Sequence, residues 1–285
     1  MSVIEANRRF FILTAARSGS TLLSAILGDV GANFGMTIPA SWDPASGDLE
    51  HPGLSRAFDF FSKAELISKH RPHFGVSRLR WVLYRSYGKK TLRAVLNSAH
   101  FVKHYNAHKL VRPAFKIGYF PTVILSYRRF EDQAISFGLM HPHADWDLLC
   151  KNYWEVYNNG LWLLNTFGRC VVAYEKMVDP SDCGWAEPLA DVTGLAVANL
   201  IDARDRRLTH APPRRETNKI NPQAYRTYDA MQALTDKAIP PSSQALRAWH
   251  RSAARWEIQP AGSKPVASCS DAWCSRSRAC SSACD

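Results

Sequence analysis

A short loop after an apolar run holds residue types that bind anions. Residues 8–15 read RRFFILTA, which predicts a buried strand, and residues 21–28 have helical spacing before a glycine. A helix start offers backbone N–H groups and the positive end of the helix dipole, and an arginine beside it adds a fork of donors. The pattern therefore predicts a phosphate-binding loop, made of Arg17, Ser18, Gly19, Ser20 and Thr21.

The spacing of this loop argues against the usual nucleoside-triphosphate chemistry. That chemistry requires the pattern G-x-x-x-x-G-K-[ST]. Here Thr14 stands where the first glycine belongs and Ser20 where the lysine belongs, while the cation is Arg17, two residues before Gly19. We therefore do not expect ATP hydrolysis or kinase activity. The same five residues would also suit a plain capped helix start.

A second motif stands further along the chain. Residues 121–127 (PTVILSY) predict another apolar strand, which Arg128 follows directly, and Ser136 lies eight residues later on an expected helix over 130–139. Arg129, at a spacing of seven from that serine, is the alternative ligand. Two anion sites far apart in sequence suit a ligand with several anionic groups.

Together these motifs resemble sulfotransferases that use 3′-phosphoadenosine 5′-phosphosulfate (PAPS). Residues 16–23 (ARSGSTLL) resemble the 5′-phosphosulfate loop, whose form R-S-G-[ST]-T-L is shared by bacterial carbohydrate sulfotransferases and tyrosylprotein sulfotransferases. Arg128 and Ser136 resemble the 3′-phosphate motif. Tyr174 resembles the tyrosine beside the adenine, although plain packing would also explain it. The resemblance covers roughly residues 8–195.

The resemblance also implies a cation at the sulfonate and further contacts to the nucleotide. Lys103 stands 25 residues before Arg128, close to where the family places a lysine near the transferring group. A surface lysine is the alternative interpretation. Arg214 and Arg215 lie in a late basic loop that could close over the nucleotide, but the loop does not match the family's glycine-rich closing motif. The family implies no metal.

The general base does not follow either pattern of the family. Position 38 is Ile where some relatives have Glu, and position 105 is Tyr where others have His. The nearest candidates are Glu50, then His51, then His104. The segment around Glu50 resembles N-P-x-G-x-x-E-H of bacterial sulfotransferase-like proteins, although a carboxylate at a helix start is an alternative role for this residue.

Positive charge is concentrated in one stretch. The formal net charge is +11, yet the 65 residues between Glu65 and Glu131 hold fourteen Lys and Arg and no acid, so the remaining chain sums to 11 − 14 = −3. Such a field attracts an anion, which would be a nucleic acid, an acidic membrane or a phosphorylated small molecule. Aromatic residues among the cations suit nucleic acid, sugars or an interfacial helix equally well.

The order of the expected elements predicts the fold. Strands separated by helices are typical of an α/β protein with a central parallel sheet, and the resemblance implies a three-layer sandwich of the P-loop sulfotransferase type. We expect one domain over 1–258, with a basic helical insert on the acceptor side at 66–120, and a disordered Cys- and Ser-rich tail at 259–285. Further expected elements are helices over 54–68, 146–167 and 185–193, helices broken at Gly75 and Gly88, a strand over 170–174, and loops over 29–52 and 212–228.

The sequence therefore predicts a PAPS-dependent sulfotransferase that acts on a hydroxyl of a carbohydrate or lipid-linked acceptor. The alternatives are a P-loop-like nucleotide kinase and a non-catalytic protein that binds nucleic acid or an acidic membrane through residues 66–130. We expect a cytoplasmic protein, because the cysteines suggest reduced thiols, and no leader or spanning segment is visible in the sequence. A peripheral place at the inner membrane face and a homodimer stay open, and we expect no nucleic-acid partner.

Overall fold

The structure is a computed structural model that describes residues 3–37, 49–69, 76–141, 143, 145–207 and 222–248. Every statement below about what is present or absent refers to those residues. The elements, in chain order, are α1 (Val3–Asn7), β1 (Arg8–Leu13), α2 (Ser20–Asp29), α3 (Pro52–Lys69), α4 (Val76–Ser98), β2 (Phe101–Lys103), α5 (Ala107–Lys116), β3 (Phe120–Tyr127), α6 (Phe130–Met140), α7 (Trp146–Phe167), β4 (Arg169–Ala173), α8 (Tyr174–Met177), α9 (Ala186–Thr193), α10 (Val197–Arg207) and α11 (Pro222–Gln232).

The described strands form a four-stranded parallel sheet in the order β2-β1-β3-β4. Ile12 of β1 lies opposite Lys103 of β2, and Leu13 lies opposite Leu125 of β3. Because the strands run in one direction, the segments that follow them emerge along one edge of the sheet. The chain leaves β1 toward β2 on one side and later reaches β3 on the other, so a switch point, where open α/β sheets bind ligands, lies between β1 and β3.

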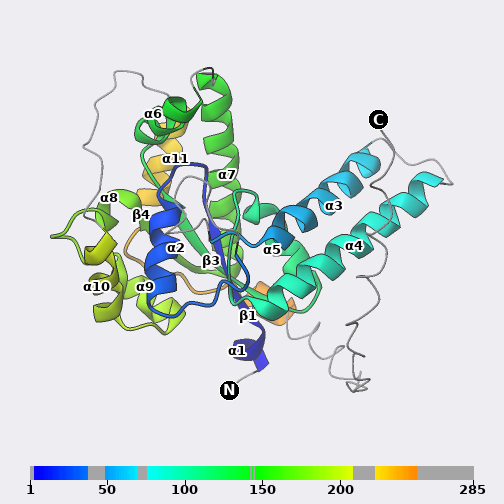
Figure 1. Ribbon diagram of the computed structural model, residues 1–285, viewed down its shortest axis with the longest axis horizontal. Helices are drawn as coiled ribbons and strands as arrows, with labels where there is room; N and C mark the ends of the chain where they lie inside the picture. The colour runs from blue at the N-terminus through cyan, green and yellow to red at the C-terminus, as the bar shows by residue number, and fades with distance from the viewer. Residues whose placement is uncertain are drawn as a thin grey trace, which may run out of the picture.

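Helices cover both faces of this sheet, as Figure 1 shows. Alternate residues of β1 point to opposite faces. Phe11 and Leu13 belong to one core, which also takes residues from α5 and α7, whereas Phe10 and Ile12 belong to the other, with α2, α9 and α10. The predicted α/β architecture around a central parallel sheet is confirmed, and the layers are consistent with a three-layer sandwich.

The basic stretch differs from its prediction at Gly88. No break occurs there, because α4 continues through this glycine as one helix of 23 residues. Gly88 is buried, and a Cβ atom at this position would lie 3.1 Å from Cε1 of Phe61. The glycine therefore permits a close approach of α3 and α4. The other expected break, at Gly75, lies outside the described residues.

Two other expectations are corrected. The basic stretch is not only an insert, because it contributes β2 to the central sheet. The predicted loop over 212–228 is wrong from Pro222 onward, where α11 begins. Proline suits the first position of a helix, where its missing N–H costs no hydrogen bond. Residues 212–221, the remainder of that loop, and the tail over 259–285 lie outside the described residues.

Candidate functional site

The candidate site lies along the edge of the sheet where the strands end. Arg17 belongs to the loop after β1, Lys103 ends β2, Arg128 follows β3, and Tyr174 follows β4. These strand ends are adjacent in the sheet, with β1 and β3 at the centre. Residues that are far apart in the sequence therefore meet at one edge, the place where parallel sheets bind ligands.

The loop after β1 has an unusual backbone. Arg17 has φ 65° and Gly19 has φ 86°, so both lie in the left-handed region. A non-glycine residue in this region costs about 1–2 kcal/mol and is often found at functional sites. The hydroxyl of Ser18 is fully buried and contacts the hydroxyl of Thr14, so it shapes the loop from within. Gly19 precedes α2 without a side-chain cap, which leaves the helix start as an anion-binding end.

The two predicted motifs meet through one hydrogen bond. Arg17 Nε donates to Ser136 Oγ at 3.1 Å, although 119 residues separate them. Arg17 belongs to the loop of the first motif and Ser136 to α6 of the second. The bond spans the switch point between β1 and β3. The structure thus brings the two predicted anion-binding segments into direct contact.

Of the two consecutive arginines, Arg128 is the one placed to receive a ligand. Arg129 is engaged, because its Nε and its Nη2 each donate to the Asp132 carboxylate at 3.2 Å. Arg128 lies with its guanidinium carbon 4.5 Å from the centre of the Tyr174 ring. Its Nε is buried and has no hydrogen-bond partner among the described residues. A buried charged donor without a partner is costly, and an anion would satisfy it.

Tyr174 joins this arginine to the first loop. A Cβ atom at Gly19 would lie 2.0 Å from Cδ2 of Tyr174, so only glycine leaves room for the ring. The ring therefore contacts both the loop and Arg128. Its predicted place beside an adenine stays a prediction, because the ring also has the packing role that the sequence left open.

Two tyrosines of α7 form hydrogen bonds with the backbone of both motifs. The sequence did not predict this role. Tyr157 donates to the carbonyl of Ser126 at 3.1 Å and accepts from the N–H of Ala15 at 3.4 Å. Tyr153, one turn earlier, donates to the carbonyl of Arg128 at 2.9 Å. Burial raises the pKa of both hydroxyls, so both stay protonated. Their i, i+4 spacing on an aromatic-rich helix was the available signal.

Lys103 lies at the start of α2. The side chain is only 4% exposed, and its Nζ donates to Thr21 Oγ1 at 3.0 Å. A surface position, the alternative weighed from the sequence, is wrong because β2 and its neighbours bury this residue. An ammonium beside the positive end of a helix is electrostatically unfavourable, and an anion between them would relieve the repulsion. Glu50 pairs with Lys103 through an isolated parallel bridge.

The three base candidates occupy different environments. His51 Nδ1 accepts from the N–H of Gly53 at 3.0 Å, and burial lowers its pKa. His104 is fully buried, which lowers its pKa to about 4. Its Nδ1 accepts from the N–H of Asn106 at 3.1 Å, and its Nε2 lies 3.0 Å from Ser55 Oγ. Both nitrogens of His104 are therefore engaged, whereas Glu50 is half-buried beside the lysine.

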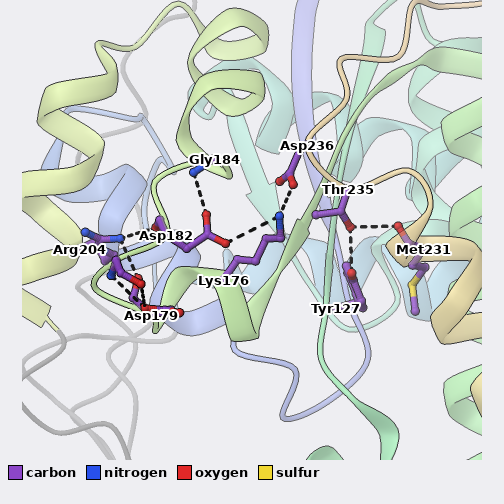
Figure 2. Close-up of polar contacts among 10 residues, drawn as sticks. Tyr127, Lys176, Asp179, Asp182, Gly184, Arg204, Met231, Thr235 and Asp236 are labelled. Carbon is purple, nitrogen blue, oxygen red and sulfur yellow. Dashed lines mark hydrogen bonds and ion pairs between the residues drawn. The ribbon is translucent and has the colours of Figure 1, made fainter.

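A polar network at the ends of β3 and β4 fixes the segments that carry the site (Figure 2). Lys176 of α8 pairs with Asp236 and, at 3.7 Å, with Asp182. The Tyr127 hydroxyl lies 2.8 Å from Thr235 Oγ1. These contacts hold the chain one residue before Arg128 and two residues after Tyr174.

The same network is completed by Arg204 of α10, whose guanidinium is almost fully buried. It donates to the carbonyls of Asp179, Pro180 and Asp182 at 2.7–3.3 Å. These carbonyls belong to the turn after α8. Arg204 therefore stabilises that turn by supplying the hydrogen bonds that a helix or strand would otherwise supply. Figure 2 shows Arg204 pointing into the turn.

An open cleft of about 890 Å³ lies elsewhere, between α3, α5 and α7. None of the predicted site residues lines it, so we do not assign it to the strand-end site. Arg214 and Arg215 lie outside the described residues. Within those residues no group of three or more His, Cys, Asp and Glu is placed to hold a metal, and no helix is long and apolar enough to cross a bilayer. No family model, curated protein or solved structure matches the chain.

Proposed function

We propose that this chain is a PAPS-dependent sulfotransferase with a P-loop-like sulfotransferase fold. The observation that carries the proposal is the hydrogen bond between Arg17 and Ser136 at the switch point of the sheet. It joins the two segments that resemble the phosphosulfate and 3′-phosphate motifs. A parallel sheet with helices on both faces agrees with this fold but is common to many functions.

The site offers separate donors for the two anionic ends of the nucleotide. The 5′-phosphosulfate would bind at the start of α2, with Arg17 and the backbone N–H groups of Ser20 and Thr21 as donors. The 3′-phosphate would bind Ser136 and Arg128, whose buried Nε has no partner in the part of the chain that the structure describes. Arginine forks suit phosphate oxygens, and both sites lie at the same edge of the sheet.

The reaction would be an in-line displacement at sulfur. The acceptor oxygen attacks the sulfuryl group as a base removes its proton, and the bond between sulfur and the 5′-phosphate oxygen breaks. The products are the sulfate ester and adenosine 3′,5′-bisphosphate. Lys103 would stabilise the charge that develops on the leaving phosphate oxygen, which is an electrostatic role that a buried, fixed cation performs well.

Glu50 is the base that we prefer. Its backbone forms a β-bridge with Lys103, the cation that we propose lies near the sulfonate. His51 comes second. Its Nδ1 accepts a hydrogen bond from the N–H of Gly53, and this contact does not involve Nε2. His104 comes third, since its use as a base would require the loss of its contact with Ser55. The acceptor would be a hydroxyl of a carbohydrate or a lipid-linked glycan.

Calorimetric titration tests the nucleotide site. We expect adenosine 3′,5′-bisphosphate to bind and ATP to bind at least about tenfold more weakly, because the loop lacks the phosphate-bridging lysine. Arg17→Ala and Arg128→Ala should each weaken bisphosphate binding, whereas Arg112→Ala, which removes an exposed cation of α5, should not. Absence of bisphosphate binding to the folded wild-type protein would refute the proposal. Preferential ATP binding would support the kinase alternative.

A transfer assay tests the base. Radiolabelled PAPS is incubated with a panel of carbohydrate and glycolipid acceptors, and sulfated products are counted. Glu50→Gln should keep bisphosphate affinity and lower transfer by about 10²–10⁴-fold, the usual contribution of a general base. Glu187→Gln, an exposed matched change on α9, should leave transfer unchanged. An active Glu50→Gln enzyme would assign the base to His51 or His104.

A further inference from the structure

The outer face of α4 carries exposed apolar side chains in a helical repeat. Leu79, Val82, Leu83 and Tyr87 are 60%, 44%, 42% and 51% exposed. Their spacings of three, four and eight residues place them on one side of the helix. We call these four residues the docking face. Most exposed apolar residues on proteins stand singly, so a row of four along one helix indicates a surface that another body covers.

The docking face lies opposite the side of α4 that packs on α3. Gly88 approaches Phe61, and Leu92 and Val95 are buried on that inner side. At 100° per residue, Gly88 lies about half a turn from Leu79 around the helix. Figure 1 shows α3 and α4 side by side, projecting away from the sheet. Leu79, Val82 and Leu83 therefore point away from α3, and Tyr87 lies at the edge of the docking face, with its ring centre 5.7 Å from that of Phe60 on α3. The face lies on a protruding element.

The charge of α4 indicates what covers this face. The helix has no acidic residue and six cations, which are Arg78, Arg80, Arg85, Lys89, Lys90 and Arg93. Arg80 lies about 100° to one side of Leu79 around the helix and Lys89 about 80° to the other, so cations flank the apolar row on both sides. All of these cations except the half-buried Arg85 are exposed. The partner must therefore offer negative charge along its surface and an apolar layer just beneath it.

We propose that α4 docks by this face on an anionic lipid bilayer. An apolar row between cations is the pattern of helices that lie in the plane of the membrane interface, where acyl chains take the apolar residues and anionic headgroups meet the cations. This proposal goes beyond the proposed function and does not depend on it. The leucines would reach below the headgroups, and Tyr87 would stay at their level.

Two other occupants fit the same face less well. A second copy of the chain that paired by this face would bring two cationic helices together, and the resulting repulsion is not compensated by any acid of α4. A nucleic acid would use the cations, but it would leave the exposed leucines without a partner. Both are outcomes that the experiment below distinguishes.

Vesicle co-sedimentation of the full chain tests the proposal. The vesicles are phosphatidylcholine alone and phosphatidylcholine with about one third phosphatidylglycerol. We expect binding only to the second kind. The double variant Leu79→Ser with Leu83→Ser should bind at least about tenfold more weakly, because each leucine loses its apolar contact. Leu139→Ser with Leu148→Ser, which removes two leucines elsewhere that are at least as exposed, should bind like wild type.

A second pair of variants tests the charges. Arg80→Gln with Lys89→Gln should weaken binding to anionic vesicles by about tenfold. Lys116→Gln with Lys151→Gln is the matched control, because both lysines are exposed on other helices. Thermal unfolding of every variant confirms that it is folded. All substitutions lie on surfaces outside the strand-end site.

Three results would overturn the proposal. One is equal vesicle binding by the apolar variant and its control, and another is equal binding of wild type to both kinds of vesicle. The third is absence of vesicle binding while another partner uses the same face. That partner would be nucleic acid if DNA or RNA binding needs Arg80 and Lys89, or a second copy if a dimer in analytical ultracentrifugation needs Leu79 and Leu83.

Discussion

The strand-end site and the α3–α4 hairpin are both cationic, but they hold their cations differently. At the strand ends, Lys103 is 4% exposed and fixed by a hydrogen bond. Arg128 has a buried Nε, and its guanidinium carbon lies over an aromatic ring. On the hairpin, Lys89 and Lys90 extend into solvent. Fixed, desolvated cations recognise an anion of one shape, whereas exposed ones create a field that salt screens within about 8–10 Å.

These two groups of cations come from one basic sequence stretch, but the fold holds them in two different ways. The stretch between Glu65 and Glu131 supplies both groups of cations. The sheet sets the positions of the cations at the strand ends, and the helical repeat sets the directions of the cations on α4. We therefore expect bisphosphate binding to depend weakly on salt and on single surface charges, and binding through α4 to depend strongly on both.

The largest expected effect concerns the joint between the two regions. His104 follows β2 and contacts Ser55 of α3, and His108 lies one turn later. Burial lowers both pKa values to about 4, from an ordinary value of 6.5. Between these two pH values the unfolded chain binds more protons than the folded one, so stability falls as pH falls. We expect a loss of about 3 kcal/mol per histidine in the free energy of unfolding between pH 6.5 and 4.

Urea denaturation across this pH range measures the loss. His104→Gln keeps a donor near Ser55 and should remove about 3 kcal/mol of the pH dependence. His141→Gln, at an exposed position, should keep the full pH dependence. If the wild-type protein is equally stable at pH 6.5 and pH 4, then His104 and His108 are not buried in the neutral form between the two regions.

The next effect compares a glycine of each region. Gly19→Ala combines a left-handed backbone with a clash against Tyr174, and we expect a loss of about 3 kcal/mol in stability together with loss of bisphosphate binding. Gly88→Ala in α4 should change stability by less than about 1 kcal/mol, because alanine favours a helix while the Phe61 ring must shift slightly.

Gly31→Ala separates strain from the clash. Gly31 is also left-handed, with φ 93°, but no atom of the described residues lies within 4 Å of an added Cβ. Its loss should be about 1 kcal/mol. Chemical denaturation and calorimetric titration provide the measurements. An equal cost at Gly19 and Gly31 would show that Tyr174 does not restrict the loop.

Local patterns predicted the turns that carry Arg17 and Arg128, because neighbouring residues in the sequence determine these turns. The run RRFFILTA and the helical spacing after Gly19 place Arg17 on a strand–loop–helix turn, and the structure has this turn. The same holds for Arg128 after β3. Both predictions depend on residues within about ten positions of each other. The contact of Arg17 with Ser136 follows once β1 and β3 are adjacent in the sheet.

What the sequence did not predict depends on tertiary contacts. Gly88 suggests a helix break from its propensity alone, yet close packing against α3 overrides that preference. The supports of the site, Tyr153 and Tyr157, were part of an aromatic-rich helix with no signal for the carbonyls that they bind. Nor did composition separate the fixed cations from the exposed ones, because burial decides this and burial is a property of the fold.

A smaller effect than that of Gly19→Ala is expected at those tyrosine supports. Tyr157→Phe removes a hydroxyl that bridges the Ser126 carbonyl and the Ala15 N–H. We expect a loss of about 1.5 kcal/mol in stability and a severalfold weaker binding of the bisphosphate, because the loop after β1 loses its link to β3. Tyr87→Phe on the exposed face of α4 is the matched change and should cost less than about 0.5 kcal/mol. Both variants are measured by denaturation and titration under one set of conditions. Equal losses of stability in the two variants would contradict the proposed difference between the regions.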